Sequence, residues 1–215
     1  MSNVLIVGFG NIGLRHCESL IKFKKIKKIF IFDTNYQKVL NFKKKIKNKK
    51  IIILKNLNLN KNNFFLSIIA TNSDVRFSLF EKIVRNFKVK FFIFEKVVFQ
   101  KQNQYDYAKK IIKQNKLKCW INCPRRTWSI FKNVKKNIKR NKKISLIISG
   151  NSWGILSNAI HFIDLFVFFT GSSSLNFNLK HLSKRLFQTK RKGFYESDGE
   201  IIVKNEKKHT LILKD

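Results

Sequence analysis

The sequence predicts an α/β protein, in which a doubly wound parallel sheet is followed by an incomplete α+β second domain. Three observations support this prediction. Short apolar segments alternate with helical segments over the first half of the chain. The single proline, Pro124, ends this alternation, and after it the pattern changes to one long helix and several short strands. We therefore expect one domain over residues 1–123 and a second over residues 124–215.

The first domain is predicted to contain a strand at each short apolar segment that turn residues bound, because such segments are typical of buried parallel strands. Those strands are expected at residues 3–8, 28–32, 51–54, 64–70, 90–95 and 118–122. Helical periodicity between them predicts helices at residues 11–25, 35–47 and 102–114. A further helix ends near residue 86, and Ser73 or Asp74 could cap its start.

The second domain has a different pattern. Residues 128–139 and 153–170 are predicted helices, the second of them long and amphipathic and ending near Gly171. Residues 144–150 form a predicted strand. Near the end of the chain, residues 199–202 and 210–213 have the pattern of the two arms of a hairpin.

The chain of 215 residues is 44% hydrophobic and carries a net charge of +34. The hydrophobic content favours a folded core. The charge could indicate a nucleic acid or an acidic membrane as partner. However, Lys, Ile, Asn and Phe are abundant together, all four have A/T-rich codons, and the lysines are scattered along the chain. We therefore attribute the charge to compositional bias and expect no specific nucleic-acid partner.

The cysteines Cys17, Cys119 and Cys123 form no paired C-x-x-C clusters, so neither a disulfide framework nor a metal site is expected. The first apolar run is too short for a signal peptide. The longest apolar segment, 155–169, is interrupted by polar residues and is too short for a membrane span. These features predict a cytoplasmic protein with reduced thiols that does not associate with membranes.

A glycine motif follows the first predicted strand and opens the first predicted helix. In this context the motif predicts a dinucleotide site of the Rossmann type. The first glycine permits a tight turn, the second lets the backbone approach a pyrophosphate, and the third allows close packing of helix and strand. The helix N-terminus then presents free N–H groups to the phosphates. The motif residues expected to bind the cofactor are Gly8, Gly10, Asn11, Ile12 and Gly13.

Asp33 follows the second predicted strand, about 20 residues after Gly13, where dinucleotide sites place an acid on the ribose. Its carboxylate could accept hydrogen bonds from the ribose hydroxyls and would repel a 2′-phosphate. The predicted cofactor is therefore NAD, and NADP is less favoured. The alternative is a glycine-rich turn next to an aspartate that faces solvent.

Further stretches of the sequence are similar to motifs of one family. They are Ile69-Ala70-Thr71-Asn72, Phe94-Glu95-Lys96-Val97, Pro124-Arg125-Arg126 and Asn158-Ala159-Ile160-His161-Phe162-Ile163-Asp164. In order and spacing, over about residues 1–170, they resemble the glucose–fructose oxidoreductase / inositol dehydrogenase (Gfo/Idh/MocA) family. The sequence departs from the family pattern at Val97, where the family has proline, and at Ser157, where it often has a carboxylate.

The resemblance implies roles for the matched residues. Lys96 would face both the nicotinamide and the substrate hydroxyl, where an ammonium stabilises developing negative charge. His161 would be the base, since the pKa of imidazole suits proton removal near neutral pH. From the residues alone, a lysine after a strand can equally be solvated and a helical histidine can equally be structural. The resemblance adds Thr71, Asn72 and Glu95 to the cofactor site, and Arg125, Arg126, Ser157, Asn158 and Asp164 to the substrate site.

Asp164 lies on the same helical face as His161 and could orient it or cap a nearby backbone group. Arg125 and Arg126 could clamp a carboxylate or phosphate of a sugar, or lie at the surface.

Together these features predict an NAD-dependent oxidoreductase that acts on a hydroxyl of a sugar or nucleotide-sugar, in surface-polysaccharide metabolism. The chain is expected to be a short or C-terminally truncated member of the family, and its second-domain sheet could complete itself by self-association. The alternative is a catalytically inactive relic or regulatory module that binds the dinucleotide. A basic nucleic-acid-binding protein is the less favoured reading.

Overall fold

The computed structural model describes residues 2–58, 62–139 and 142–215. The chain divides into two compact units, Met1–Asn122 and Cys123–Asp215, and each is described by itself.

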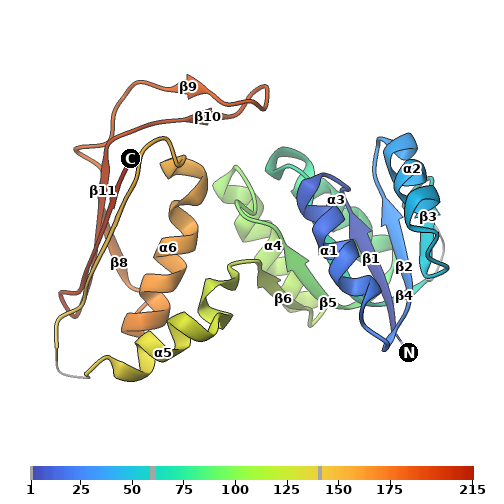
Figure 1. The fold of residues 1–215 in the computed structure, drawn as a ribbon, viewed down its shortest axis with the longest axis horizontal. Coiled ribbons are helices and arrows are strands. Elements are labelled where there is room, and N and C mark those ends of the chain that lie inside the picture. Colours follow the sequence, from blue (N-terminus) through green and yellow to red (C-terminus); the bar gives the residue numbers. More distant parts are fainter. Residues whose placement is uncertain (1, 59–61, 140–141) are drawn as a thin grey trace. The chain divides into compact units, whose positions relative to one another are not determined.

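The first unit is built on a six-stranded sheet in the described residues, and every neighbouring pair of strands is parallel. The strand order is β3-β2-β1-β4-β5-β6 (Figure 1). The strands are β1 (Ser2–Val7), β2 (Ile26–Phe32), β3 (Ile51–Leu54), β4 (Asn63–Ile69), β5 (Lys88–Phe94) and β6 (Lys118–Ile121). The central strand β1 is almost wholly apolar because helices cover both of its faces.

Alternation along β1 divides the core of this unit between the two faces of the sheet. Ile6 packs with Cys17 of α1 (Asn11–Ile21) and Val39 of α2 (Tyr36–Ile46). Leu5 belongs to the cluster on the other face, with residues from α3 (Ser73–Asn86) and α4 (Gln102–Gln114). Side chains on successive strand positions point to opposite faces, so one strand supplies both layers.

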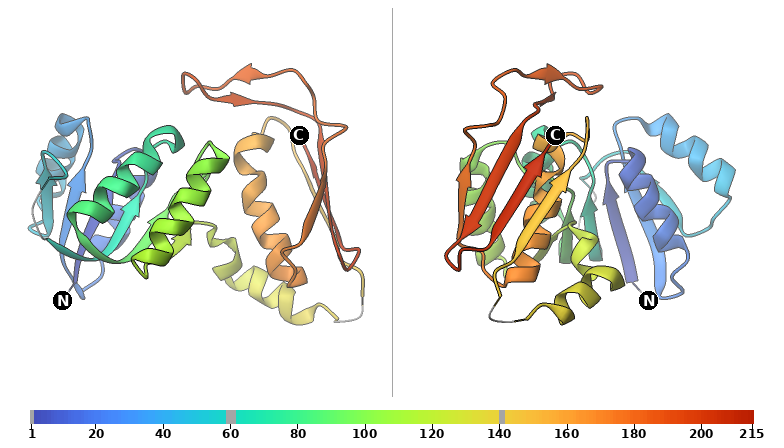
Figure 2. Two further views of the ribbon diagram at one scale, coloured as in Figure 1. Left: turned by 180° about the vertical axis from the view of Figure 1, so that it is seen from behind. Right: turned by 60° about the vertical axis from the view of Figure 1, so that its left-hand side comes forward.

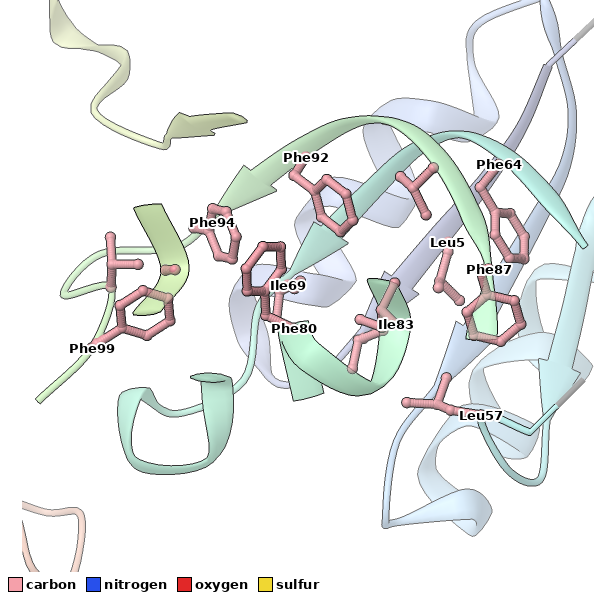
Figure 3. Close-up of a cluster of buried hydrophobic side chains, with 14 of the residues drawn as sticks. Leu5, Leu57, Phe64, Ile69, Phe80, Ile83, Phe87, Phe92, Phe94 and Phe99 are labelled. Carbon is pink, nitrogen blue, oxygen red and sulfur yellow. The ribbon is translucent and has the colours of Figure 1, made fainter. Parts of the chain in front are cut away.

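Phenylalanine dominates the core beneath α3 (Figure 3). The Phe80 ring lies 5.3 Å from that of Phe92 and 5.1 Å from that of Phe94, in edge-to-face arrangements. Burying each such ring contributes about 1.5–3 kcal/mol. These contacts fix α3 against the last residues of β5, close to the edge of the sheet where the strands end.

The second unit packs a helix on a mixed sheet (Figure 2). The sheet order is β7-β12-β11-β8, with β7 parallel to β12 and the other pairs antiparallel. Ile155, Ala159 and Phe166 of the long helix pack on Val203 and Leu211 of the sheet. The elements are α5 (Ser129–Asn137), β7 (Ser145–Ser149), α6 (Ile155–Thr170), β8 (Leu175–Asn178), β9 (Phe187–Gln188), β10 (Tyr195–Glu196), β11 (Glu200–Asn205) and β12 (Thr210–Lys214). A 3-10 turn, Pro124–Thr127, precedes α5.

The opposite face of this sheet carries a row of isoleucines. Ile147 of β7 pairs with Ile212 of β12, which pairs with Ile202 of β11, and Ile147 is 59% exposed. Self-association through this sheet stays a prediction.

The fold class predicted from the sequence is confirmed, and two local expectations are wrong. The first helix ends at Ile21 rather than near residue 25, because the chain turns at Phe23 and β2 begins at Ile26. Neither Ser73 nor Asp74 is the N-cap of α3. That position belongs to Asn72, with no capping hydrogen bond from its side chain. Among the described residues, no helix has the length and apolar character needed to cross a membrane.

Candidate functional site

The predicted cofactor residues of the first unit gather at one edge of the sheet. The glycine motif follows β1, Asp33 follows β2, Thr71 follows β4 and Lys96 follows β5. Because all these strands are parallel, their carboxyl ends meet at the same edge. The strand order reverses between β1 and β4, and ligands of open α/β sheets bind at this switch point.

The glycine motif has the geometry of a phosphate-binding turn. Gly8 has a φ of 91°, and a Cβ there would lie 2.7 Å from the backbone N of Thr71. A Cβ on Gly13 would lie 2.0 Å from the carbonyl oxygen of Gly8, so close packing excludes any side chain there too. At Gly10, by contrast, a Cβ would meet nothing within 4 Å. Gly10 is therefore required neither by its backbone conformation nor by packing.

The first turn of α1, next to Gly10, is exposed. Gly10 is the N-cap and supplies no side-chain hydrogen bond, while Asn11 and Ile12 are exposed in the first turn. The first N–H groups of a helix have no partner within the helix. A Rossmann turn uses this glycine to let the backbone approach a pyrophosphate, and the open space at Gly10 fits that use.

Asp33 is held beside this turn. Its carboxylate accepts hydrogen bonds from the backbone N–H groups of Phe9 and Asn35, the second at 2.7 Å. The two bonds involve different oxygens, and an ionised carboxylate can accept about four. Asp33 therefore links the end of β2 to the glycine turn and keeps acceptor capacity for two ribose hydroxyls.

Glu95, directly after β5, is a buried ionisable group of the site. Its side chain interacts with His16 of α1 at 2.8 Å and accepts a hydrogen bond from the Asn122 amide at 2.6 Å. Burial acts to raise the pKa of Glu95, but hydrogen bonds to His16 and Asn122 and the charges of His16 and Arg76 outweigh it. The pKa of Glu95 is therefore held below its ordinary value.

Thr71, Asn72 and Lys96 lie on the loops that leave β4 and β5. Thr71 and Lys96 are half-buried, and Asn72 is exposed. The peptide bond between Lys96 and Val97 is cis.

In the second unit, the predicted substrate residues lie on α6 and on the turn before α5. The Arg126 guanidinium binds the Asp164 carboxylate with two nitrogens, Nε at 2.8 Å from Oδ2 and Nη2 on Oδ1. This hydrogen bonding raises the pKa of Arg126. The sequence left open whether Asp164 orients His161 or caps a backbone group, and the structure instead pairs it with Arg126.

Arg125 lies against an aromatic ring rather than a carboxylate. Its guanidinium carbon is 3.9 Å from the ring centroid of Phe162, the residue after His161 on α6. Burial lowers the pKa of Arg125, and the charge of Cys123 acts in the opposite direction.

Ser157 and Asn158 help to form the start of α6. The Asn158 amide donates to the Trp153 carbonyl at 2.7 Å, and the Ser157 hydroxyl donates to the Gly154 carbonyl at 3.3 Å. His161 is half-buried one turn further along the helix. These polar side chains therefore sit near His161 on the same helix, and at least some of their hydrogen-bonding capacity serves the helix itself.

Sequence reasoning missed three residues that support the site: His16, Arg76 and Asn122. His16 lies three residues after Gly13, where the helical periodicity of α1 turns it toward the strand ends. This spacing could have indicated from the sequence that His16 lies at the site. Arg76 and Asn122 have no local signal, because most of their partners lie on other loops, 19 to 27 residues away in the sequence. Two cavities of about 490 and 480 Å³ lie elsewhere among the described residues. The candidate site is defined by the ends of the parallel strands.

No family model matches this sequence, and no curated protein matches it. Solved structures do. A putative myo-inositol dehydrogenase from Sinorhizobium meliloti matches with a TM-score of 0.76 at 16% identity, over 100% of this chain and 68% of its own. Scyllo-inositol dehydrogenase from Lactobacillus casei, solved with bound NAD(H) and scyllo-inositol, matches with a TM-score of 0.76 at 17% identity, over 99% of this chain and 68% of its own.

A third similar structure is a super-repressor mutant of Gal80p from Saccharomyces cerevisiae, with a TM-score of 0.76 at 12% identity, over 99% of this chain and 67% of its own. At these identities the likeness establishes the fold alone. The fold is that of inositol dehydrogenases and related oxidoreductases, as the motif resemblance implied. It is shared by proteins named as dehydrogenases and by Gal80p, solved as a super-repressor mutant, so the function has to be argued from the site.

Proposed function

We propose that this protein is an NAD-dependent oxidoreductase that transfers a hydride between a nicotinamide cofactor and a CH–OH group of a polyol or sugar. The observation that carries the proposal is the convergence of four loops at the β1/β4 switch point. These loops hold the open glycine turn, the fixed carboxylate of Asp33 and Lys96. The bound nicotinamide would supply the hydride acceptor or donor, which no side chain can provide.

In this proposal each half of the dinucleotide has its own residues. The N-terminus of α1, with Gly10 at its cap, binds the pyrophosphate, and Asp33 accepts from the ribose hydroxyls of the adenosine half. The carboxylate disfavours a 2′-phosphate, so NAD is preferred over NADP. Thr71, Asn72 and Glu95, on the loops after β4 and β5, line the nicotinamide half.

The motif resemblance assigns parts of the chemistry on the substrate to Lys96 and to His161. The Lys96 ammonium hydrogen-bonds the reacting hydroxyl oxygen and stabilises the negative charge that develops there. The His161 imidazole takes the hydroxyl proton. A polyol or sugar is the proposed substrate class because a similar structure holds scyllo-inositol. The motif resemblance extends this class to nucleotide-sugars of surface-polysaccharide metabolism in the cytoplasm.

A second candidate function is dinucleotide binding without turnover, as in a regulatory module. Two observations favour it. Asp164 and Arg126 neutralise each other, which leaves fewer charges for a substrate. The same fold also occurs in Gal80p, which was solved as a super-repressor mutant.

Cofactor binding tests both candidates, with the fluorescence of Trp120, Trp128 and Trp153 as the signal. Titration with NADH is expected to give a far lower Kd than titration with NADPH. Gly10→Val adds a side chain where the structure leaves open space, so the variant is expected to fold normally. It should weaken NADH binding by at least about tenfold, the equivalent of one charge-assisted hydrogen bond.

Asp33→Ala is expected to reduce the preference for NADH over NADPH. Asp106→Asn, which changes an exposed carboxylate on α4, is the matched control and should change neither Kd. A folded wild-type protein that binds neither cofactor would refute both candidates. Binding without any NADH production from scyllo-inositol, other polyols or nucleotide-sugars would favour the second. Turnover that is lost in Lys96→Ala would favour the first.

A further inference from the structure

A buried arginine joins the two loops that are proposed to hold the nicotinamide half of the cofactor. Arg76 lies on the first turn of α3 and is only 3% exposed. Its Nη1 donates to the carbonyl oxygens of Glu95 at 2.6 Å and Val98 at 3.0 Å, and also to that of Val97. Its Nη2 donates to the carbonyl oxygen of Thr71. One guanidinium therefore binds the loop after β4 and the loop after β5.

The position of this guanidinium is set by the core. Arg76, Phe80 and Ile83 lie on one face of α3, at spacings of four and three residues. Phe80 and Ile83 are fully buried against the sheet (Figure 3). The packing of Phe80 on Phe92 and Phe94 fixes the helix relative to the end of β5. The guanidinium one turn earlier therefore has little freedom to move away from the strand ends.

The tethered carbonyls bracket Lys96. The carbonyls of Glu95 and Val97 belong to its two chain neighbours, so the backbone on both sides of Lys96 is tied to the same cation. A guanidinium suits this role because it presents five N–H donors in a rigid plane. A lysine in its place would supply one compact point charge with three donors and could not span two loops in the same way.

We propose that Arg76 is a positioning residue, which holds the Lys96 loop in register with the Thr71 turn so that both face the nicotinamide half of the cofactor. That these loops face the nicotinamide half of a cofactor rests on the proposed function, whereas the tethering of the two loops by Arg76 does not. The lowered pKa of Glu95, to which the charge of Arg76 contributes, agrees with a guanidinium close beneath this loop.

The first test needs no ligand. Hydrogen exchange followed by mass spectrometry is compared in the wild-type protein, Arg76→Lys and Arg76→Gln. Arg85→Lys is the matched control, because it makes the same change on the exposed face of α3. In both Arg76 variants, amide exchange over residues 95–100 and 71–73 is expected to rise by about tenfold or more, since hydrogen bonds from a charged donor are lost. Exchange in β1, in α1 and in the second unit should stay at the wild-type rate.

Two results of the exchange experiment would overturn the proposal. One is an amide exchange rate at residues 95–100 of Arg76→Lys that equals the wild-type rate. A positive charge without the planar guanidinium would then be enough to hold the loop. The other is an equal rise throughout the first unit, because Arg76 would then contribute to overall stability rather than to the position of two loops.

The second test separates the two halves of the cofactor. NADH and ADP-ribose share the pyrophosphate and adenosine, but only NADH carries the nicotinamide. Arg76→Lys is expected to weaken NADH binding by about tenfold, again the loss of charge-assisted hydrogen bonds. ADP-ribose binding should be unchanged. Equal weakening of both ligands would refute the positioning role. If the wild-type protein bound neither, the proposed function would fail, and the exchange experiment would still decide the role of Arg76.

Discussion

Glu95 illustrates how a single residue links a helix to the end of a neighbouring strand at the carboxyl edge of the sheet. Its carboxylate joins His16 of α1 to Asn122, which follows β6. Because the folded protein holds the pKa of Glu95 below its ordinary value of 4.5, ionised Glu95 stabilises the folded state. This contribution is complete at pH values above 4.5 and is lost as the pH falls through the lower pKa of the folded protein.

Glu95→Gln is therefore expected to lower the free energy of unfolding near neutral pH by about 1–3 kcal/mol, the range for hydrogen bonds to a charged group. The difference from the wild-type protein should begin to shrink as the pH falls below 4.5, where Glu95 of the unfolded state becomes protonated, and it should disappear below the lower pKa of the folded protein. Urea unfolding monitored by circular dichroism at several pH values measures this difference in the free energy of unfolding. Glu81→Gln, at a partly exposed i,i+4 pair on α3, is the control and should cost far less. A Glu95 difference that did not depend on pH would contradict the assignment of the ionised form.

At the scale of elements, α6 shows how distant parts of the chain support a candidate catalytic helix. Glu196 of β10 is buried, and its two oxygens accept the backbone N–H groups of Leu156 and Ser157 at 2.8 and 3.1 Å. Asp215 accepts those of Gly154 and Ile155 at 3.0 and 3.2 Å. Two carboxylates at the N-terminus are favourable, since the helix dipole is positive there.

Glu196→Ala is expected to destabilise the second unit by about 1–2 kcal/mol, because two N–H groups at the start of α6 lose their acceptor. Hydrogen exchange in the first turn of α6, one turn before His161, should accelerate in the same variant. Asp198→Ala, an exposed carboxylate two residues away, should have little effect on either measurement. If the two variants had equal stability, the capping role of Glu196 would be wrong.

The elements themselves were largely predictable from the sequence, because they follow local patterns. The strand Ile51–Leu54 and the helix Gln102–Gln114 have the predicted bounds, since hydrophobic periodicity and adjacent turns define them. The end of α1 was not predictable, because residues 22–28 contain no glycine or proline to mark it.

The candidate site was predictable only where its residues belong to a local motif. The glycine turn and Asp33 have a spacing that follows from the geometry of one βαβ unit. Arg76 instead gains its role from carbonyl groups on two other loops. Arg126 and Asp164 are 38 residues apart in the sequence, and the ion pair between them has no pattern within either segment. Pairings of this kind depend on tertiary packing, and a single sequence does not indicate which distant residues come into contact.

The whole molecule is dominated by its charge of +34, with 46 Lys and Arg against 12 Asp and Glu. The candidate site uses few of these cations, namely Lys96, Arg76 and the Arg125–Arg126 pair. If the others reflect compositional bias over solvated faces, they attract any polyanion without reading its sequence. Non-specific binding of this kind depends on the release of counterions from phosphates, so salt should abolish it.

Binding to RNA distinguishes this interpretation from a selected nucleic-acid function. Two unrelated single-stranded RNAs and one hairpin of equal length are titrated with the protein, with fluorescence anisotropy as the signal. We expect similar affinities for all three at low salt and a parallel loss of roughly a thousandfold or more between about 50 and 200 mM salt, as for a contact to several phosphates. Excess unlabelled RNA should displace NADH only at low salt, since a non-specific polyanion competes through charge alone. One RNA that kept tight binding at about 200 mM salt while the others lost it would show base or shape recognition, and the excess charge would then belong to a function of its own.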